Sequence, residues 1–266
     1  MKAFFITIPH SGERIPEEAP WLKGRDEVFL MDDVDRYVDR LYSPVLQKLA
    51  LPFVKTDWHR YALDLNRLPD DVDQDSVIGS PNPPGKFPTG LHWVRSMKGQ
   101  NILPQPISRE LHERLVEKYF EPFHAAVRAQ YDFFFANGAR PVFQLDAHSM
   151  PSLGTKNHRD PGERRADIVV SDCKGLSCST SYKDLVIESY RSTGLKVAYN
   201  WPYFGGRVTE TYGHPEKGQE AIQVEINRDL YMDEKTKQWK PKEGQSLSEK
   251  LTQAVEAIFK ALPDVS

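Results

Sequence analysis

The stretch FFITIPHSGE, residues 4–13, indicates the fold class of the chain. Its apolar and β-branched residues stop at a proline and are followed at once by polar side chains, a pattern typical of a short buried strand. Similar strands are predicted at 52–55, 61–65, 142–145, 167–170 and 222–226. Helical periodicities lie between them, at 33–49, 108–138, 182–193 and 248–262. Alternation of strands and helices indicates an α/β fold with a mostly parallel central sheet.

The composition is that of a globular protein with no nucleic-acid or membrane partner. The chain has 266 residues, 39% of them hydrophobic, which is enough for a substantial core. A formal net charge of only -3 argues against binding to nucleic acids or membrane surfaces. No apolar run approaches the roughly 20 residues that span a bilayer. Cys173 and Cys178 match no disulfide framework and no structural zinc site, so we expect reduced thiols and a cytoplasmic protein.

One long segment interrupts the alternation. Residues 68–106 are rich in proline and have no sustained helical or strand period. Loops of this length inside a domain are usually functional, and Phe87 and Trp93 favour one that packs against the protein. We therefore expect one catalytic domain over residues 1–266, with an ordered active-site loop at 68–106.

Polar residues follow several predicted strands, where parallel α/β sheets bind their ligands. His10 and Glu13 follow the first strand, and His148 follows a later one. Two imidazoles and a carboxylate with an open fourth position make up a catalytic zinc site. The alternative is a hydrogen-bonded structural histidine, since His-x-x-Glu spacings also occur by chance.

Other residues near the strand ends would support such a site. Asp146 precedes His148 by two positions on an extended chain, so it could accept the other ring N–H of that histidine; a turn acceptor is the alternative. Asn66 and Arg67 follow a predicted buried strand, and Arg60 precedes it. A guanidinium in this position needs an anionic partner, either a substrate or a neighbouring carboxylate.

Glu225 is the candidate general base. It alternates with Val224 and Ile226, which places it opposite the apolar face of its strand. A partly buried glutamate beside a metal-bound water suits this role, because desolvation raises its pKa. The alternative is an ion pair with Arg228 or Arg207.

Taken in order, these motifs resemble the functional series of zinc carboxypeptidases. A closer resemblance, to the N-formylglutamate amidohydrolase family, covers nearly the whole chain. It is carried by the segments IPHSG at 8–12, DVD at 33–35, DLNR at 64–67, DAHS at 146–149, GG at 205–206 and QVE at 223–225. The resemblance implies a three-layer α/β fold of the phosphorylase/hydrolase-like type, which zinc carboxypeptidases also have. It further implies hydrolysis of an amide in a small anionic N-acyl amino acid, foremost N-formyl-L-glutamate in histidine degradation, with a divalent metal expected to be zinc.

The same resemblance implies roles for individual residues. His10 and His148 would be metal ligands, with Glu13 and Asp33 as rivals for the carboxylate position; Asp33 could instead be a helix N-cap. Glu225 would be the base that activates the metal-bound water. The substrate would be held by Arg60, Asn66, Arg67 and Ser149.

Two other functions of the same site remain as alternatives. A carboxypeptidase or peptide amidase would need an open groove for a larger substrate. A non-catalytic ligand-binding relative would keep the fold and the acidic-ligand pocket without turnover. Within the long loop, Trp93 and Arg95 could favour a larger or different acidic acyl amino acid.

Overall fold

The computed structural model describes residues 2–264 and contains a six-stranded sheet in the order β2-β1-β3-β6-β4-β5. Neighbouring strands are parallel except β4 and β6, which are antiparallel. This confirms the predicted α/β class with a mostly parallel sheet. The strands are β1 Phe4–Ile8, β2 Phe53–Lys55, β3 Val142–Met150, β4 Ile168–Ser171, β5 Val197–Tyr199 and β6 Gln219–Asn227.

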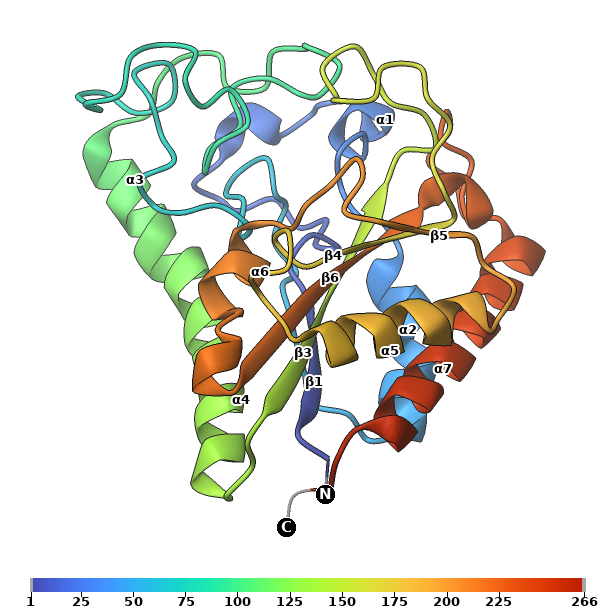
Figure 1. The fold of residues 1–266 in the computed structure, drawn as a ribbon. Coiled ribbons are helices and arrows are strands. Elements are labelled where there is room, and N and C mark those ends of the chain that lie inside the picture. The colour runs from blue at the N-terminus through green and yellow to red at the C-terminus, as the bar shows by residue number, and fades with distance from the viewer. Residues whose placement is uncertain (1, 265–266) are drawn as a thin grey trace.

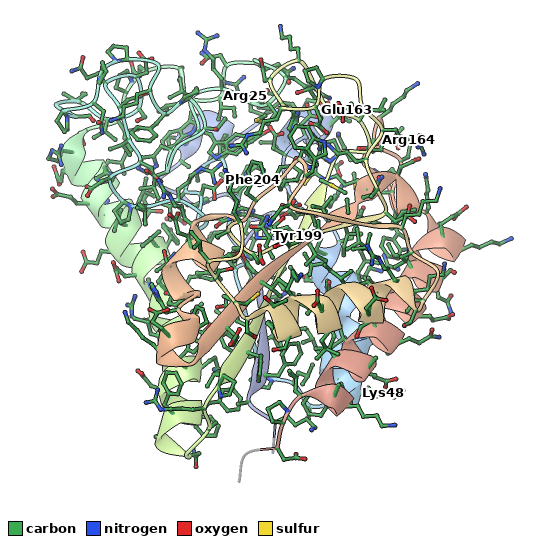
Figure 2. All side chains as sticks on the ribbon, viewed as in Figure 1. Arg25, Lys48, Glu163, Arg164, Tyr199 and Phe204 are labelled. Carbon is green, nitrogen blue, oxygen red and sulfur yellow. The ribbon has the colours of Figure 1, made fainter. Side chains whose placement is uncertain are left out.

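Helices cover both faces of the sheet and give a three-layer arrangement (Figure 1). One face carries α2 Val38–Lys48, α5 Thr180–Arg191 and α7 Pro241–Ala261. The other carries α3 Arg109–Leu115, α4 Glu121–Ala136 and α6 Arg207–Tyr212, while the short α1 Glu27–Leu30 lies among the loops. Single turns of other helix types lie at Pro20–Leu22, Val116–Phe120, Pro215–Lys217 and Arg228–Leu230. Side chains fill both spaces between the layers (Figure 2).

The two faces of the central strands differ chemically because successive side chains point to opposite sides. Toward α2, α5 and α7, strands β3 and β6 present core residues: Phe143, Leu145, Ala147, Ile222, Val224 and Ile226. Toward α4 they present buried polar residues: Gln144, Asp146, His148, Gln223 and Glu225. Polar groups buried in this way need partners: Gln144 accepts from Tyr131 of α4 over 2.8 Å, and Asp146 accepts from Thr7 of β1 over 2.6 Å.

Two of the differences between predicted and observed elements bear on the site. Residues 61–65 form turns instead of a strand. Their apolar side chains are buried, but the backbone N–H of Asp64 bonds to Leu91 of the long loop, so the strand-like pattern reflects burial under a loop. The helix expected from residue 33 begins only at Val38, after Tyr37, whose φ of 69° is left-handed.

The segment 68–106 contains only isolated β-bridges, as predicted from its irregular sequence. It lies at the top of Figure 1, at the end of the molecule where β1, β3 and β6 terminate. Leu91, Trp93 and Leu103 bury their side chains and hold the segment against the protein. Within residues 2–264, no helix is both long and apolar enough to cross a membrane. Both cysteines are free thiols.

Candidate metal and catalytic site

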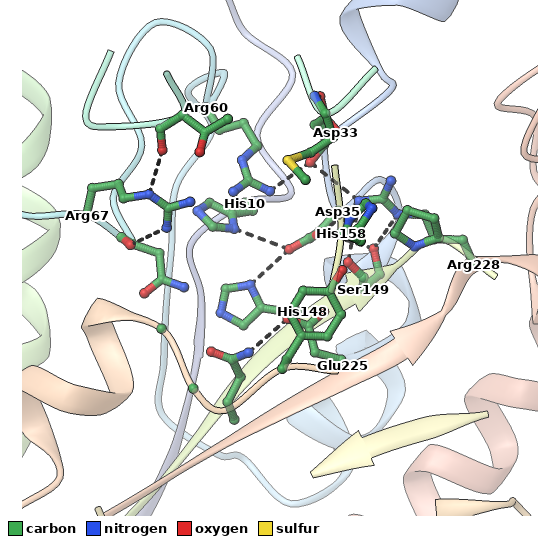
Figure 3. Close-up of a pocket in the computed structure, with 18 of the residues that line it drawn as sticks. His10, Asp33, Asp35, Arg60, Arg67, His148, Ser149, His158, Glu225 and Arg228 are labelled. Carbon is green, nitrogen blue, oxygen red and sulfur yellow. Dashed lines mark hydrogen bonds and ion pairs between the residues drawn. The ribbon is translucent and has the colours of Figure 1, made fainter. Parts of the chain in front are cut away.

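His10, Asp35 and His148 meet in a buried group (Figure 3). Their potential ligand atoms all lie within 4.8 Å of one another. Asp35 Oδ2 is 3.0 Å from His148 Nδ1 and 3.3 Å from His10 Nδ1. His10 Nδ1 is buried without a hydrogen-bond partner in the described part of the chain. A cation between these atoms would satisfy it.

Local backbone contacts bring the three residues together. His10 lies just beyond β1, and its carbonyl accepts a hydrogen bond of 3.0 Å from the backbone N–H of Asp35. Ser11 Oγ donates to the carbonyl of Asp35 over 3.1 Å. His148 lies within β3, in register with Glu225 on β6. The site is therefore set by one turn and by the pairing of adjacent parallel strands.

Each histidine is also held by a second carboxylate. His10 Nε2 lies 2.6 Å from Asp64 Oδ1, and His148 Nε2 lies 3.0 Å from Asp146 Oδ2, as expected for Asp146. When each Nε2 donates its proton to this outer carboxylate and the ring is neutral, each Nδ1 keeps a lone pair that can ligate a metal ion. Outer carboxylates of this kind orient metal-ligating histidines, so the group fits a divalent cation.

The charges in the group are strongly coupled. Burial opposes ionisation of Asp35, yet the hydrogen bond from His148 and the charge of the two nearby histidines hold its pKa well below its usual range. Burial disfavours the charged form of His148, but the charge and hydrogen bond of Asp146, together with Asp35, raise the pKa of this histidine well above its usual range. Asp35 and Asp146 thus stabilise a positive charge between them, which a proton on the histidine or a metal ion can supply.

The carboxylate in the group is Asp35, which corrects the expectation of Glu13 or Asp33. Glu13 accepts a hydrogen bond of 2.9 Å from Arg36 Nε, and its side chain is 40% exposed. Asp33 accepts from the hydroxyl of Tyr61 over 2.6 Å. The error follows from the helix start: residues 33–35 form the connection before α2 and do not belong to its first turn.

Glu225 lines the same cavity as the three clustered residues. The sequence left an ion pair with Arg228 or Arg207 as the alternative role of Glu225, but within the described residues neither pair forms. The side-chain partner of Glu225 is Gln223, whose Nε2 donates to Glu225 Oε1 over 2.8 Å. Burial raises the pKa of Glu225 to about 7. The carboxylate is therefore poised to accept and return a proton near neutral pH.

All four residues expected to bind the substrate line the cavity, but three are already engaged. Arg60 pairs with Asp64 over 2.8 Å. Asn66 Oδ1 accepts from the backbone N–H of Val208 over 2.7 Å. The Ser149 hydroxyl donates over 3.0 Å to Asp35, so it supports the metal group directly.

Arg67 is the guanidinium that lacks a carboxylate. Its Nε donates to the carbonyl of Thr89 and its Nη1 to that of Asn66, at 2.7 and 2.8 Å. Within residues 2–264, no carboxylate lies within ion-pair distance of it. Burial lowers its pKa. A partly buried cation facing a cavity of about 320 Å³ is a natural site for a ligand carboxylate.

Several residues of the candidate site were not singled out from the sequence. Asp35 and Asp64 were only parts of longer motifs, although a correct helix boundary would have drawn attention to Asp35. Arg228 was considered only as a partner of Glu225, yet its Nη2 donates to Asp35 Oδ1 over 3.0 Å. Other residues of the cavity wall that were not singled out include Met97, His158 and Tyr203.

Comparison with known proteins identifies the family of the chain. Residues 2–232 match the family model of N-formylglutamate amidohydrolase. N-formylglutamate deformylases of Pseudomonas putida and Pseudomonas aeruginosa are 27% and 28% identical, over 86% of this chain and 81% and 82% of theirs.

Solved structures show the same similarity over nearly the whole chain. The crystal structure of N-formylglutamate amidohydrolase from Ralstonia eutropha has a TM-score of 0.86 at 27% identity, covering 98% of this chain and 94% of that one. A gene product of Agrobacterium tumefaciens shares the fold at 19% identity, with a TM-score of 0.69 over 96% of this chain and 90% of its own. Since the family model spans most of its length, the chain belongs to the N-formylglutamate amidohydrolase family.

Proposed function

We propose that this protein is a zinc-dependent amidohydrolase that converts N-formyl-L-glutamate and water to formate and L-glutamate. The observation that carries the proposal is the convergence of His10, Asp35 and His148 beside Glu225 in one cavity. The substrate is taken from the names of the relatives. It would place the enzyme in histidine degradation, in the cytoplasm.

The two histidines and Asp35 would hold the metal through His10 Nδ1, His148 Nδ1 and a carboxylate oxygen. Zinc suits this donor set, and when bound it lowers the pKa of water and polarises a carbonyl oxygen. The outer carboxylates Asp64 and Asp146 keep the imidazoles in the required orientation.

Glu225 moves the proton. It takes a proton from the attacking water as the water oxygen bonds to the formyl carbon, and it returns that proton to the amide nitrogen as the C–N bond breaks. Gln223 holds the carboxylate in place by its hydrogen bond to Oε1. Burial raises the pKa of Glu225 to about 7, which keeps its proton affinity high enough for this exchange.

Metal dependence is the first prediction. We expect the purified protein to contain about one zinc per chain and to release formate from N-formyl-L-glutamate, and we expect a chelator to stop the reaction until zinc is restored. Elemental analysis and a formate assay measure both. Bound zinc without formate release would mean that the substrate is a different acyl amino acid. Release of C-terminal amino acids from peptides would favour a carboxypeptidase, and absence of both metal and turnover would favour a ligand-binding protein.

Arg67 is predicted to bind a carboxylate of the substrate. Replacing it with methionine should raise KM by about 10- to 100-fold, because hydrogen bonds to charged groups contribute about 1.5–3 kcal/mol. Arg95 provides the matched control: it is exposed, belongs to the long loop and does not line the cavity. Steady-state kinetics of both methionine variants test this role. An equal KM in R67M and wild type would remove Arg67 from the substrate site.

A further inference from the structure

We infer that the hydroxyl of Tyr203 donates a hydrogen bond to the acyl oxygen of the substrate amide, an inference that rests on the proposed hydrolysis. Tyr203 lines the cavity that contains His10, His148 and Glu225. It lies between β5 and α6, close to the two glycines at 205–206.

A buried ion pair fixes the position of the phenol oxygen. Arg165 Nη1 donates to Tyr203 Oη over 2.9 Å and to the carbonyl of Pro151 over 3.1 Å. The other nitrogens of the guanidinium donate to both oxygens of Asp160, at 2.7 and 2.8 Å. The side chains of Arg165 and Asp160 are each only 1% exposed. A bidentate, buried pair of this kind leaves the arginine little freedom.

The proton of Tyr203 is left for a ligand. An arginine N–H can only donate, so the phenol oxygen is the acceptor in its bond to Arg165 and keeps its own O–H. Among the described residues, no acceptor lies within hydrogen-bond distance of that proton. Burial raises the pKa of Tyr203, so the hydroxyl stays protonated. The bond from Arg165 draws electron density from the oxygen and makes the hydroxyl a stronger donor.

The position of Tyr203 within the cavity favours the acyl oxygen over the substrate carboxylate. Arg67 and Gly206 line both this cavity and a neighbouring one, whereas Tyr203 and His158 line the catalytic cavity and not that neighbour. Tyr203 and His158 pack together with ring centroids 6.4 Å apart. The unused proton of Tyr203 therefore faces the cavity that holds Glu225, and Tyr203 is not among the residues that line the neighbouring cavity with Arg67.

A donor at this place would act on the charge that forms during the reaction. When the water oxygen bonds to the formyl carbon, the carbonyl electron pair moves to the acyl oxygen, and it returns when the C–N bond breaks. A fixed hydroxyl beside that oxygen stabilises the charged intermediate more than the neutral amide. No proton needs to leave Tyr203.

The kinetic test is the variant Y203F. We expect kcat to fall by about 100-fold with KM nearly unchanged, as for the loss of one donor to a developing oxyanion. Tyr199 offers a matched control, because its hydroxyl bonds to Asp172 and it does not line the cavity. Y199F should keep the wild-type kcat. A Y203F enzyme with wild-type kcat, or one whose only change is a higher KM, would overturn the inference.

A binding measurement separates this inference from the proposed function. Formate represents the acyl half of the substrate and L-glutamate the amino-acid half. In NMR titrations of the zinc-loaded protein, Y203F should bind formate several-fold more weakly than wild type and L-glutamate equally well. Unchanged formate binding, or a loss confined to L-glutamate, would refute the role of Tyr203. If the wild type does not hydrolyse N-formyl-L-glutamate, the proposed function fails, and the formate titration still decides the role of the tyrosine.

Discussion

The variant E225Q is expected to lose about 10²- to 10⁴-fold in kcat for N-formyl-L-glutamate while its metal content stays the same, since this is the range that general acid–base groups contribute. Glutamine has nearly the same shape as glutamate and can still accept the hydrogen bond of 2.8 Å from Gln223. It cannot take up a proton from water. The substitution breaks no ion pair of Glu225 in the described residues, so the loss should be confined to the chemical step.

Glu220 provides a matched control for this experiment. It is also a buried glutamate on β6, but it lies near the opposite end of the strand, in register with Phe143, and does not line the cavity. E220Q should retain wild-type turnover, with any effect limited to thermal stability. Formate release, elemental analysis and thermal unfolding of both variants complete the comparison. A fully active E225Q would exclude Glu225 as the base.

The alternation along β3 and β6 explains why much of the site could be predicted from sequence. Asp146 and His148 share one side of an extended chain, and Glu225 lies opposite the core-facing Val224. Because the strands are parallel, residues at their carboxyl ends meet at one edge of the sheet. Periodicity and the α/β pattern together therefore locate these side chains without knowledge of the tertiary structure.

The remaining members depend on contacts that no local pattern contains. Arg228 reaches Asp35 and the carbonyl of Asp32, at 3.0 and 2.7 Å, although 193 and 196 positions of sequence separate them. Asp64 faces His10 from turns whose buried side chains have a strand-like pattern. Asp35 was missed because the helix start was placed five residues too early, at 33 instead of 38. Such boundaries are set by tertiary contacts, here the bond between Asp35 and His10.

Removal of the Asp35 carboxylate should have the largest combined effect on metal binding and stability. D35A is expected to bind no zinc and to lose about 3–5 kcal/mol of unfolding free energy even without metal. The reason is Arg228, which is buried and would lose the carboxylate that accepts its Nη2–H. D35N keeps the shape of the side chain and replaces D35A in the experiment if D35A fails to fold. We expect D35N to remain folded but to bind metal much more weakly than the wild type.

The rival carboxylates give the controls. E13A should retain zinc and change stability by at most about 1 kcal/mol, because Glu13 is 40% exposed and forms a surface ion pair. D33A should also retain zinc, at a cost of about 1–3 kcal/mol for the unsatisfied hydroxyl of Tyr61. Loss of zinc in E13A or D33A, or equal retention in all three alanine variants, would contradict the assignment of Asp35.

Unfolding must be followed both with chelator and with saturating zinc, because the two conditions separate two contributions of Asp35. Bound metal stabilises only a protein that can hold it, by an amount that grows with the logarithm of free metal over Kd. With chelator, D35A and wild type differ only by the unpaired Arg228 and the lost contacts of the carboxylate. With zinc, the difference should widen for D35A and stay constant for E13A. A difference that does not widen would mean that Asp35 is a structural partner of Arg228 and not a metal ligand.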